Sequence, residues 1–230
     1  MISRQPLSQA HVAELAQEFE GMDAEDVMGW AMDAFGSRIA ISTSFQAEGI
    51  VAIDLAHQID PGVRVLTVDT GRLPQETYDL IDRVREHYGI SVEIHYPDQD
   101  HLSSMTTKYG TNSFYNSVLQ RLRCCEIRKV DPLKIALGGL DAWITGLRRS
   151  QSETRANIPK VAIDLSKGDI VKVNPLADWS SDDVWDYIRT RGLPYNFLYD
   201  QGYTSIGCAP CTRPIESGED PRAGRWWWEN

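Results

Sequence analysis

Apolar and polar residues alternate along the chain in a way that predicts strands and helices in turn. Apolar residues recur at helical spacing over residues 78–88, and Ser180 or Ser181 is expected to cap a helix that ends at Gly192. Strands that alternate with helices indicate right-handed crossovers. The expected fold class is therefore α/β, with a parallel sheet flanked by helices. The short apolar runs that predict its strands are residues 38–44, 63–69, 91–97 and 142–146.

The same patterns divide the chain into three parts of one domain. Residues 1–36 carry two apolar stripes at helical spacing and predict an N-terminal helical cap. Residues 37–192 are expected to form an α/β nucleotide-binding core, which includes two short strands around the hairpin signal Lys167-Gly168. Residues 193–230 are rich in Pro, Gly and aromatic residues and show little periodicity. They predict an irregular, cluster-binding C-terminal segment.

Composition narrows the functional classes. The chain has 230 residues and a formal net charge of −10, which argues against a general nucleic-acid binder because such proteins have a net basic surface. No apolar run is long enough to span a bilayer, and the N-terminus lacks the pattern of a signal peptide. We therefore expect a cytoplasmic protein with neither nucleic acid nor membrane as a partner. The oligomeric state stays open, a homo-oligomer included.

The four cysteines form two pairs with unusual spacing. Cys124 and Cys125 are adjacent on an expected helix, and Cys208 and Cys211 form a CxxC in the irregular segment. Adjacent cysteines are a poor half of a zinc site, which wraps knuckles around one ion. They can each bind a different iron of a [4Fe-4S] cluster. The chemistry favours this cluster as the cofactor, with a zinc site and free or redox-active thiols as the alternatives.

Basic residues gather where an anion could bind, although the protein is acidic. The polar loop after the run at 142–146 contains three arginines within residues 148–155, and guanidinium groups suit phosphate and sulfate oxygens. Lys129 lies one helical turn beyond the tandem cysteines. The alternative is a solvated surface patch. The loop STSFQAEG at residues 42–49 matches neither GxGxxG nor GxxxxGK, so ordinary dinucleotide and P-loop sites are excluded.

Five strings together resemble the phosphoadenylylsulfate and adenylylsulfate reductase family over about residues 38–229. The resemblance implies an adenine nucleotide alpha-hydrolase-like, Rossmann-like fold. The CC plus CxxC set looks like the branch that carries a [4Fe-4S] cluster and prefers adenylylsulfate (APS) over its 3′-phosphorylated form (PAPS). The strings are STSFQAEGIVAIDLA, VDTGRLPQETY, CCEIRKVDPL, WITGLRRSQSETR and GCAPCTRPIESGEDPRAGRWWWE.

Matching to the family's motifs implies a role for each matched residue. The metal ligands would be Cys124, Cys125, Cys208 and Cys211, and Lys129 would lie between the cluster and the substrate. The substrate-binding residues would be Ser42, Thr43, Ser44, Asp69, Thr70, Gly71, Arg72, Leu73, Arg148, Arg149, Gln151, Ser152, Arg155, Arg222 and Arg225.

The resemblance also implies a reaction, the reduction of APS to sulfite and AMP in sulfate assimilation. In the family, a tail thiolate attacks the sulfur of the phosphosulfate and leaves an enzyme S-sulfocysteine, which thioredoxin or a similar dithiol resolves. All four cysteines of this chain match cluster ligands, so the nucleophilic cysteine is expected beyond Asn230. The rival interpretations are a PAPS reductase and a non-catalytic iron–sulfur nucleotide-binding protein.

Overall fold

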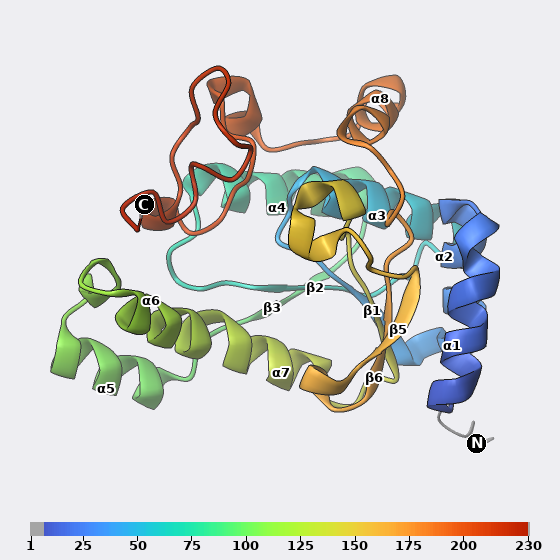
Figure 1. Cartoon of the computed structure of the whole chain (residues 1–230), viewed down its shortest axis with the longest axis horizontal. Helices are drawn as coiled ribbons and strands as arrows, with labels where there is room; N and C mark the ends of the chain where they lie inside the picture. Colours follow the sequence, from blue (N-terminus) through green and yellow to red (C-terminus); the bar gives the residue numbers. More distant parts are fainter. Residues whose placement is uncertain (1–6, 230) are drawn as a thin grey trace.

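A twisted sheet of six strands forms the centre of the molecule (Figure 1). The computed structural model describes residues 7–229, so residues 1–6 of the predicted cap and Asn230 lie outside the described part. The strand order is β3-β2-β1-β4-β6-β5, parallel throughout except that β5 runs antiparallel to β6. This confirms the expected α/β class and the terminal hairpin. The strands are β1 Ile39–Ser42, β2 Val65–Val68, β3 Val92–His95, β4 Ala142–Ile144, β5 Val161–Asp164 and β6 Ile170–Val173.

Helices cover both faces of the sheet. In Figure 1, α3 and α4 lie on one side of the strands, and α5, α6 and α7 lie on the other. The helices are α1 Gln9–Glu18, α2 Ala24–Phe35, α3 Ala47–Ile59, α4 Gln75–Tyr88, α5 Gln99–Tyr109, α6 Val118–Cys125, α7 Asp131–Leu137 and α8 Ser181–Arg191. A π-helical turn, Glu126–Val130, joins α6 to α7. The short 3₁₀ helices are Phe19–Gly21, Gly36–Arg38, Ser113–Tyr115, Arg149–Gln151, Glu153–Arg155, Leu165–Lys167, Phe197–Gln201 and Ala209–Cys211.

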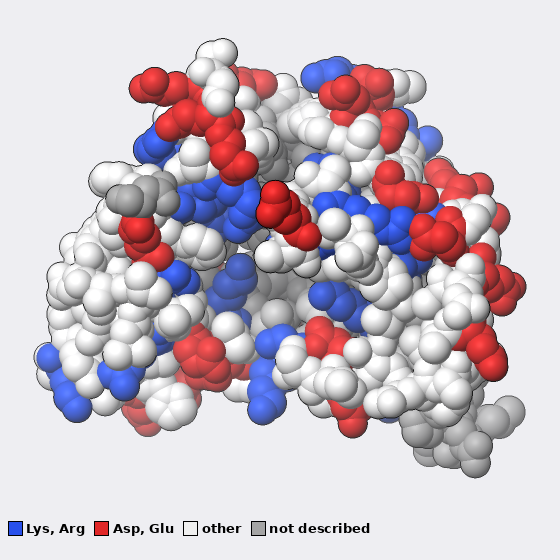
Figure 2. Space-filling model, in the orientation of Figure 1, with Lys and Arg blue, Asp and Glu red and all other residues white. Residues whose placement is uncertain are grey.

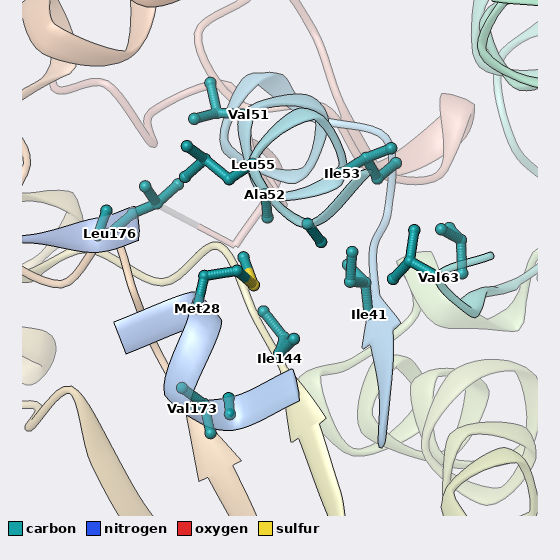
Figure 3. Close-up of a cluster of buried hydrophobic side chains, with 14 of the residues drawn as sticks. Met28, Ile41, Val51, Ala52, Ile53, Leu55, Val63, Ile144, Val173 and Leu176 are labelled. Carbon is teal, nitrogen blue, oxygen red and sulfur yellow. The ribbon is translucent and has the colours of Figure 1, made fainter. Parts of the chain in front are cut away.

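The main core lies between α2, α3 and the sheet. Figure 3 shows Met28 of α2 and Leu55 of α3 beside the strand residues Ile41 and Ile144. Helix α3 is apolar on nearly all sides because it packs against the sheet, α2 and α8 at once. A smaller cluster on the opposite face packs Leu137 of α7 and its neighbours against the sheet. Both faces of the parallel sheet are therefore buried, as this type of sheet requires.

Helix α8 is attached to the core through the buried carboxylate of Asp54 on α3. The Asp54 oxygens accept hydrogen bonds from the hydroxyls of Tyr187 at 2.8 Å and Tyr88 at 3.0 Å. Arg191 Nε lies 2.8 Å from Asp54 Oδ2. Burial, followed by the hydrogen bond to Asp54, raises the pKa of Tyr187 to about 12. The helix begins at the capping box of Ser180 and ends before Gly192, which confirms its predicted bounds.

The C-terminal segment folds back over the carboxyl ends of the strands without long helices. Residues 193–229 contain short 3₁₀ turns and an isolated antiparallel bridge between Thr212 and Arg225. Figure 1 places this segment, in orange to red, above the strand ends and close to α6. Near the other end of the chain, α1 packs on β5. Between residues 7 and 229, no helix is long and apolar enough to cross a membrane.

Candidate active site

A large cavity opens where the carboxyl ends of β1, β2 and β4 meet the C-terminal segment. Its volume is about 970 Å³, and its walls come from the three strand-end loops, the turn after α6 and the segment around residues 203–226. Figure 2 shows lysine and arginine atoms gathered in and around the hollow at the centre of this face, although the protein is acidic overall. Ligands of open α/β sheets bind at this edge. The cavity is therefore the candidate site.

The loop after β1 presents Ser42, Thr43 and Ser44 to the cavity. Phe45 follows with a left-handed φ of 56°, and its ring is fully buried. The backbone N–H of Phe45 donates to Thr43 Oγ1 at 2.9 Å. A non-glycine residue in this conformation costs free energy, which the buried ring and the hydrogen bond offset. The three hydroxyl residues are thus held in a fixed turn.

The turn after β2 presents Thr70, Arg72 and Leu73 to the cavity, but it places Asp69 and Gly71 behind the wall. One carboxylate oxygen of Asp69 accepts the backbone N–H of Gly71 at 2.7 Å and the hydroxyl of Tyr78 at 2.9 Å. Gly71 has a φ of 69°, which glycine adopts without strain. These two predicted substrate residues therefore shape the turn and do not line the cavity.

The polar loop after β4, residues 146–155, places some of its arginines at the cavity and another away from it. Arg148, Gln151 and Arg155 line the cavity. Arg149 lies elsewhere, because its guanidinium pairs with Glu20 beside α1, with Nη2 and Oε2 2.8 Å apart. Arg149 does not line the cavity, and its contact with Glu20 joins the N-terminal helices to this loop.

Ser152, also predicted to bind substrate, does not line the cavity either. Its hydroxyl lies 3.0 Å from the hydroxyl of Thr154 within the same loop. The two hydroxyls therefore satisfy each other near the surface.

Several cations on the cavity wall have no acidic partner, among them Lys129, Arg155, Arg222 and Arg225. Within residues 7–229 none of them forms an ion pair with Asp or Glu. Lys129 lines the cavity with an exposed surface, and protein atoms crowd around its amine. This crowding lowers the pKa of Lys129, as does the nearby charge of Arg225. Burial and the charge of Arg222 likewise lower the pKa values of Arg155 and Arg225. An anion in the cavity would relieve this repulsion.

All four cysteines lie on the wall of the same cavity. Cys124 and Cys211 are buried, Cys125 and Cys208 are partly buried, and none forms a disulfide. Burial, followed by the charge of Cys208, raises the pKa of Cys211 to about 12, so without a metal this thiol stays protonated. Cys208 Sγ also lies 3.2 Å from the hydroxyl of Thr70, in the turn after β2. The two predicted cysteine pairs are thus brought together beside the nucleotide turn.

The four thiols are the soft ligands that a zinc ion or an iron–sulfur cluster would use. Within residues 7–229, no three His, Cys, Asp or Glu side chains are close enough to hold one metal ion. A zinc site draws four sulfurs onto one atom, whereas a [4Fe-4S] cluster places each sulfur on a separate iron at a corner of a larger body. The four thiols lie on one wall of the cavity, and their number matches the four corners that a [4Fe-4S] cluster offers to cysteine.

Several cavity residues were not identified from the sequence, and two of them are charged residues with informative positions. Glu48, in the first turn of α3, lines the cavity and pairs with Arg148, and Arg121 of α6 also lines it. Glu48 is an acidic residue in the first turn of a mostly apolar helix, close after the STS loop, and this position could have drawn attention to it. Arg121 lies one turn before Cys125 and had no comparable signal, because arginine is common on exposed helix faces.

Known proteins resemble the chain over most of its length. Residues 38–214 match the phosphoadenosine phosphosulfate reductase domain. The chain is 50% identical over 192 residues to the adenosine 5′-phosphosulfate reductase of Allochromatium vinosum, covering 84% of this chain and 75% of that protein. It is 46% identical over 224 residues to the probable 5′-adenylylsulfate reductase 1, chloroplastic, of Oryza sativa subsp. japonica, covering 94% of this chain but 46% of the rice protein.

Among solved structures, the phosphate complex of phosphoadenylyl-sulfate (PAPS) reductase from Candida auris superposes with a TM-score of 0.76 at 29% identity. The match covers 90% of this chain and 98% of that one. The structural match and the sequence match thus indicate the same family. The chain belongs to the phosphoadenosine phosphosulfate reductase domain family.

Proposed function

We propose that the protein reduces adenosine 5′-phosphosulfate (APS) to sulfite and AMP. The observation that carries this proposal is that cations without acidic partners and four cysteines line one cavity at the carboxyl edge of the sheet. The cations suit a doubly anionic phosphosulfate, and the cysteines suit a metal-assisted or thiol reaction. The names of the relatives from Allochromatium vinosum and rice support the same reaction.

We further propose that Cys124, Cys125, Cys208 and Cys211 hold a [4Fe-4S] cluster. Support comes from their number, their free state and their position on one wall. When bound, such a cluster would tie the C-terminal segment to α6 and tune the electrostatic field at the anion, without a redox step of its own. Cluster binding would deprotonate the buried thiols, because iron binds the thiolate form.

The chain's own residues would bind and polarise the substrate. Lys129, Arg155, Arg222 and Arg225 would hold the phosphosulfate oxygens and stabilise the charge that develops on the departing phosphate. Ser42, Thr43 and Ser44 would donate hydroxyl hydrogen bonds. Because these groups are fixed before the substrate arrives, little reorganisation is needed in the transition state.

The reaction needs a thiolate other than the four proposed cluster ligands. This thiolate would attack the sulfur of APS, forming a sulfur–sulfur bond, and the bond between sulfur and the phosphate oxygen would break as AMP leaves with its electron pair. A dithiol such as thioredoxin would then attack the S-sulfocysteine and release sulfite. The sulfur gains two electrons, and the dithiol is oxidised to a disulfide.

APS is preferred to PAPS as the proposed substrate because two relatives named for APS are 50% and 46% identical to this chain over the aligned residues. The Candida auris enzyme, named for PAPS, is 29% identical. Four free thiols also agree with a reducing compartment such as the cytoplasm, where thioredoxin is available.

Anaerobic turnover of the full-length protein tests the proposal. The protein is incubated with APS and reduced thioredoxin, and sulfite, AMP and oxidised thioredoxin are quantified. Equal amounts of all three products are expected. Release of pyrophosphate from ATP, with no binding of APS, would instead indicate an adenylyl-transfer enzyme and would refute the proposal.

A further inference from the structure

Strand β3 forms one edge of the sheet and pairs with β2 on one side (Figure 1). The backbone N–H of Asp69, just after β2, donates to the carbonyl of His95 at 2.9 Å, so His95 turns its backbone groups towards β2. Successive residues of a strand turn their backbone groups to opposite sides. Glu93 therefore also faces β2, and the backbone groups of Val92, Ile94 and Tyr96 face outwards.

The outer side of β3 is open. Across the described part of the chain, the backbones of Val92, Ile94 and Tyr96 form no hydrogen bond. Ile94 is 37% exposed and Tyr96 is 61% exposed. The strand at the opposite edge, β5, instead has α1 packed against it. The two edges of the sheet thus differ, and β3 has free donors and acceptors.

This edge lacks the features that usually prevent strand pairing. Exposed edges are commonly guarded by lysine, proline or an unpaired charge. Residues 91–96 contain neither lysine nor proline. Their one carboxylate, on Glu93, is already paired with Arg64 of the same chain, with Nε–Oε1 and Nη2–Oε2 distances of 2.8 and 3.0 Å. The edge is therefore suited to accept another strand.

The sequence of β3 is complementary to itself in one antiparallel register. A two-fold axis beside Ile94 places this residue opposite Ile94 of a second copy, and Val92 opposite Tyr96 of that copy. All three outward-facing residues then exchange backbone N–H···O bonds with the second copy. A shift of the register by two residues in one direction would place Glu93 opposite itself, which like charges disfavour. A shift in the other direction leaves Val92 without a partner on the strand.

Charge complementarity supports the same register. It places Glu93 opposite His95 of the second copy, on the face of the sheet that α7 covers. The hydrogen bond from Arg64 lowers the pKa of Glu93, so this carboxylate is ionised at neutral pH. Its oxygens keep free lone pairs, and an imidazole N–H can donate to them whether the ring is neutral or charged. On the other face, the exposed ring of Tyr96 would cover Val92 of the second copy.

We infer that β3 is a dimerisation edge, at which two copies of this chain pair antiparallel about a two-fold axis at Ile94. The two six-stranded sheets then become one continuous sheet. Because the strands of the two copies run in opposite directions, the two cavities open at opposite ends of the dimer. Neither cavity is covered, so the inference is independent of the proposed function.

Sedimentation of the full-length protein, purified anaerobically, tests the inference over about 1–100 μM. One paired strand edge makes a small interface, so a dissociation constant of about 1–10 μM is expected. Ile94→Pro removes an N–H that faces the second copy and that β2 does not use. This substitution should therefore leave the fold intact and weaken dimerisation by at least about tenfold.

A pair of charged variants tests the two-fold axis itself. Ile94→Lys and Ile94→Glu each place like charges opposite one another, so each variant alone should sediment as a monomer. An equimolar mixture of the two should form a dimer, because lysine then faces glutamate. Ile59→Lys is the matched control, since Ile59 is a 44% exposed isoleucine at the end of α3, away from this edge. It should dimerise like the wild type.

The outcomes separate the dimer from the reaction. A wild type that remains a monomer at about 100 μM would overturn the inference. Folded Ile94 variants that dimerise as well as the wild type would overturn it too, because the contact would lie elsewhere. Turnover of APS per chain should be equal in the wild type and in monomeric Ile94 variants. A dimeric wild type without any turnover would instead refute the proposed function and leave the dimer standing.

Discussion

Arg121 and Glu229 form a two-armed ion pair, with Nε–Oε1 and Nη2–Oε2 distances of 2.9 Å each. Both side chains are largely enclosed, and the Arg121 guanidinium also lies 4.5 Å from the ring centroid of Trp226. The pair joins α6, which ends in the tandem cysteines, to the C-terminal segment beyond the CxxC. The two parts of the chain that supply the cysteines are therefore fastened together by charge as well as by apolar contacts.

Removing the charge of Glu229 should destabilise the attachment of the C-terminal segment to α6. Glu229→Gln is expected to lower the free energy of unfolding by about 1–2 kcal/mol, because a charge-assisted hydrogen-bond pair is lost at a mostly enclosed position. Urea unfolding measures the change, and limited proteolysis should show earlier cleavage within residues 213–229. Glu216→Gln alters an exposed carboxylate of the same segment and serves as the control. Equal effects of the two substitutions would contradict the role of the pair.

The cluster proposal predicts a linked loss of iron and order. Cys208→Ser should lose iron and acid-labile sulfide in anaerobically purified protein, and its C-terminal segment should become sensitive to proteases, because ligation contributes to folding free energy. Metal analysis and sulfide assay measure the outcome. Ser217→Ala, on the same segment, should keep the full iron content. Stoichiometric zinc without sulfide in the unsubstituted protein would contradict the cluster.

Two neighbouring arginines should differ sharply in substrate binding. Arg155 lines the cavity without an acidic partner, whereas Arg149 points away and pairs with Glu20. Arg155→Met is expected to weaken APS binding by about 10- to 100-fold through the lost charge-assisted hydrogen bonds, and Arg149→Met should change it less than about twofold. Titration of both variants with APS measures this. A larger loss for Arg149→Met would place the anion on the other side of the loop.

The contact between Glu20 and Arg149 should make the cap sensitive to acid. The hydrogen bond from Arg149 lowers the pKa of Glu20 from its ordinary value of 4.5. Since the folded pKa is the lower one, the stabilisation is complete above about pH 4.5 and is lost as the pH falls through the folded pKa. The difference in Tm between wild type and Glu20→Gln should therefore be present at about pH 7 and shrink below about pH 4.5. A difference that grows on acidification would reverse this sign.

Local sequence patterns predicted most strands and several helices, and the elements that they missed were missed for physical reasons. The strands were found because buried parallel strands are short apolar runs between turn residues. Helix α5 was not expected, because only Met105 of its eleven residues is buried and the apolar period is weak. The π-helical turn after Cys125 also left no sign, since a changed hydrogen-bond register does not alter composition.

The site was predictable in its residue types but not in the direction of each side chain. Adjacent arginines 148 and 149 look equivalent in sequence, yet one meets Glu48 and the other Glu20. Both carboxylates lie at least a hundred residues from their arginines. Such pairings depend on the tertiary fold, so no local pattern reveals which guanidinium remains available for a ligand.

The cavity can form only late in synthesis, because its walls come from distant parts of the chain. The cavity takes walls from residue 42 to residue 226, and its central strand β1 pairs with β4 about a hundred residues later. A ribosome-bound chain therefore has no complete nucleotide pocket until almost all of the 230 residues have emerged. Local helices can form early, but these distant pairings must wait for loop closure over long separations. Nucleotide binding by this protein would thus report that the distant walls of its cavity have come together.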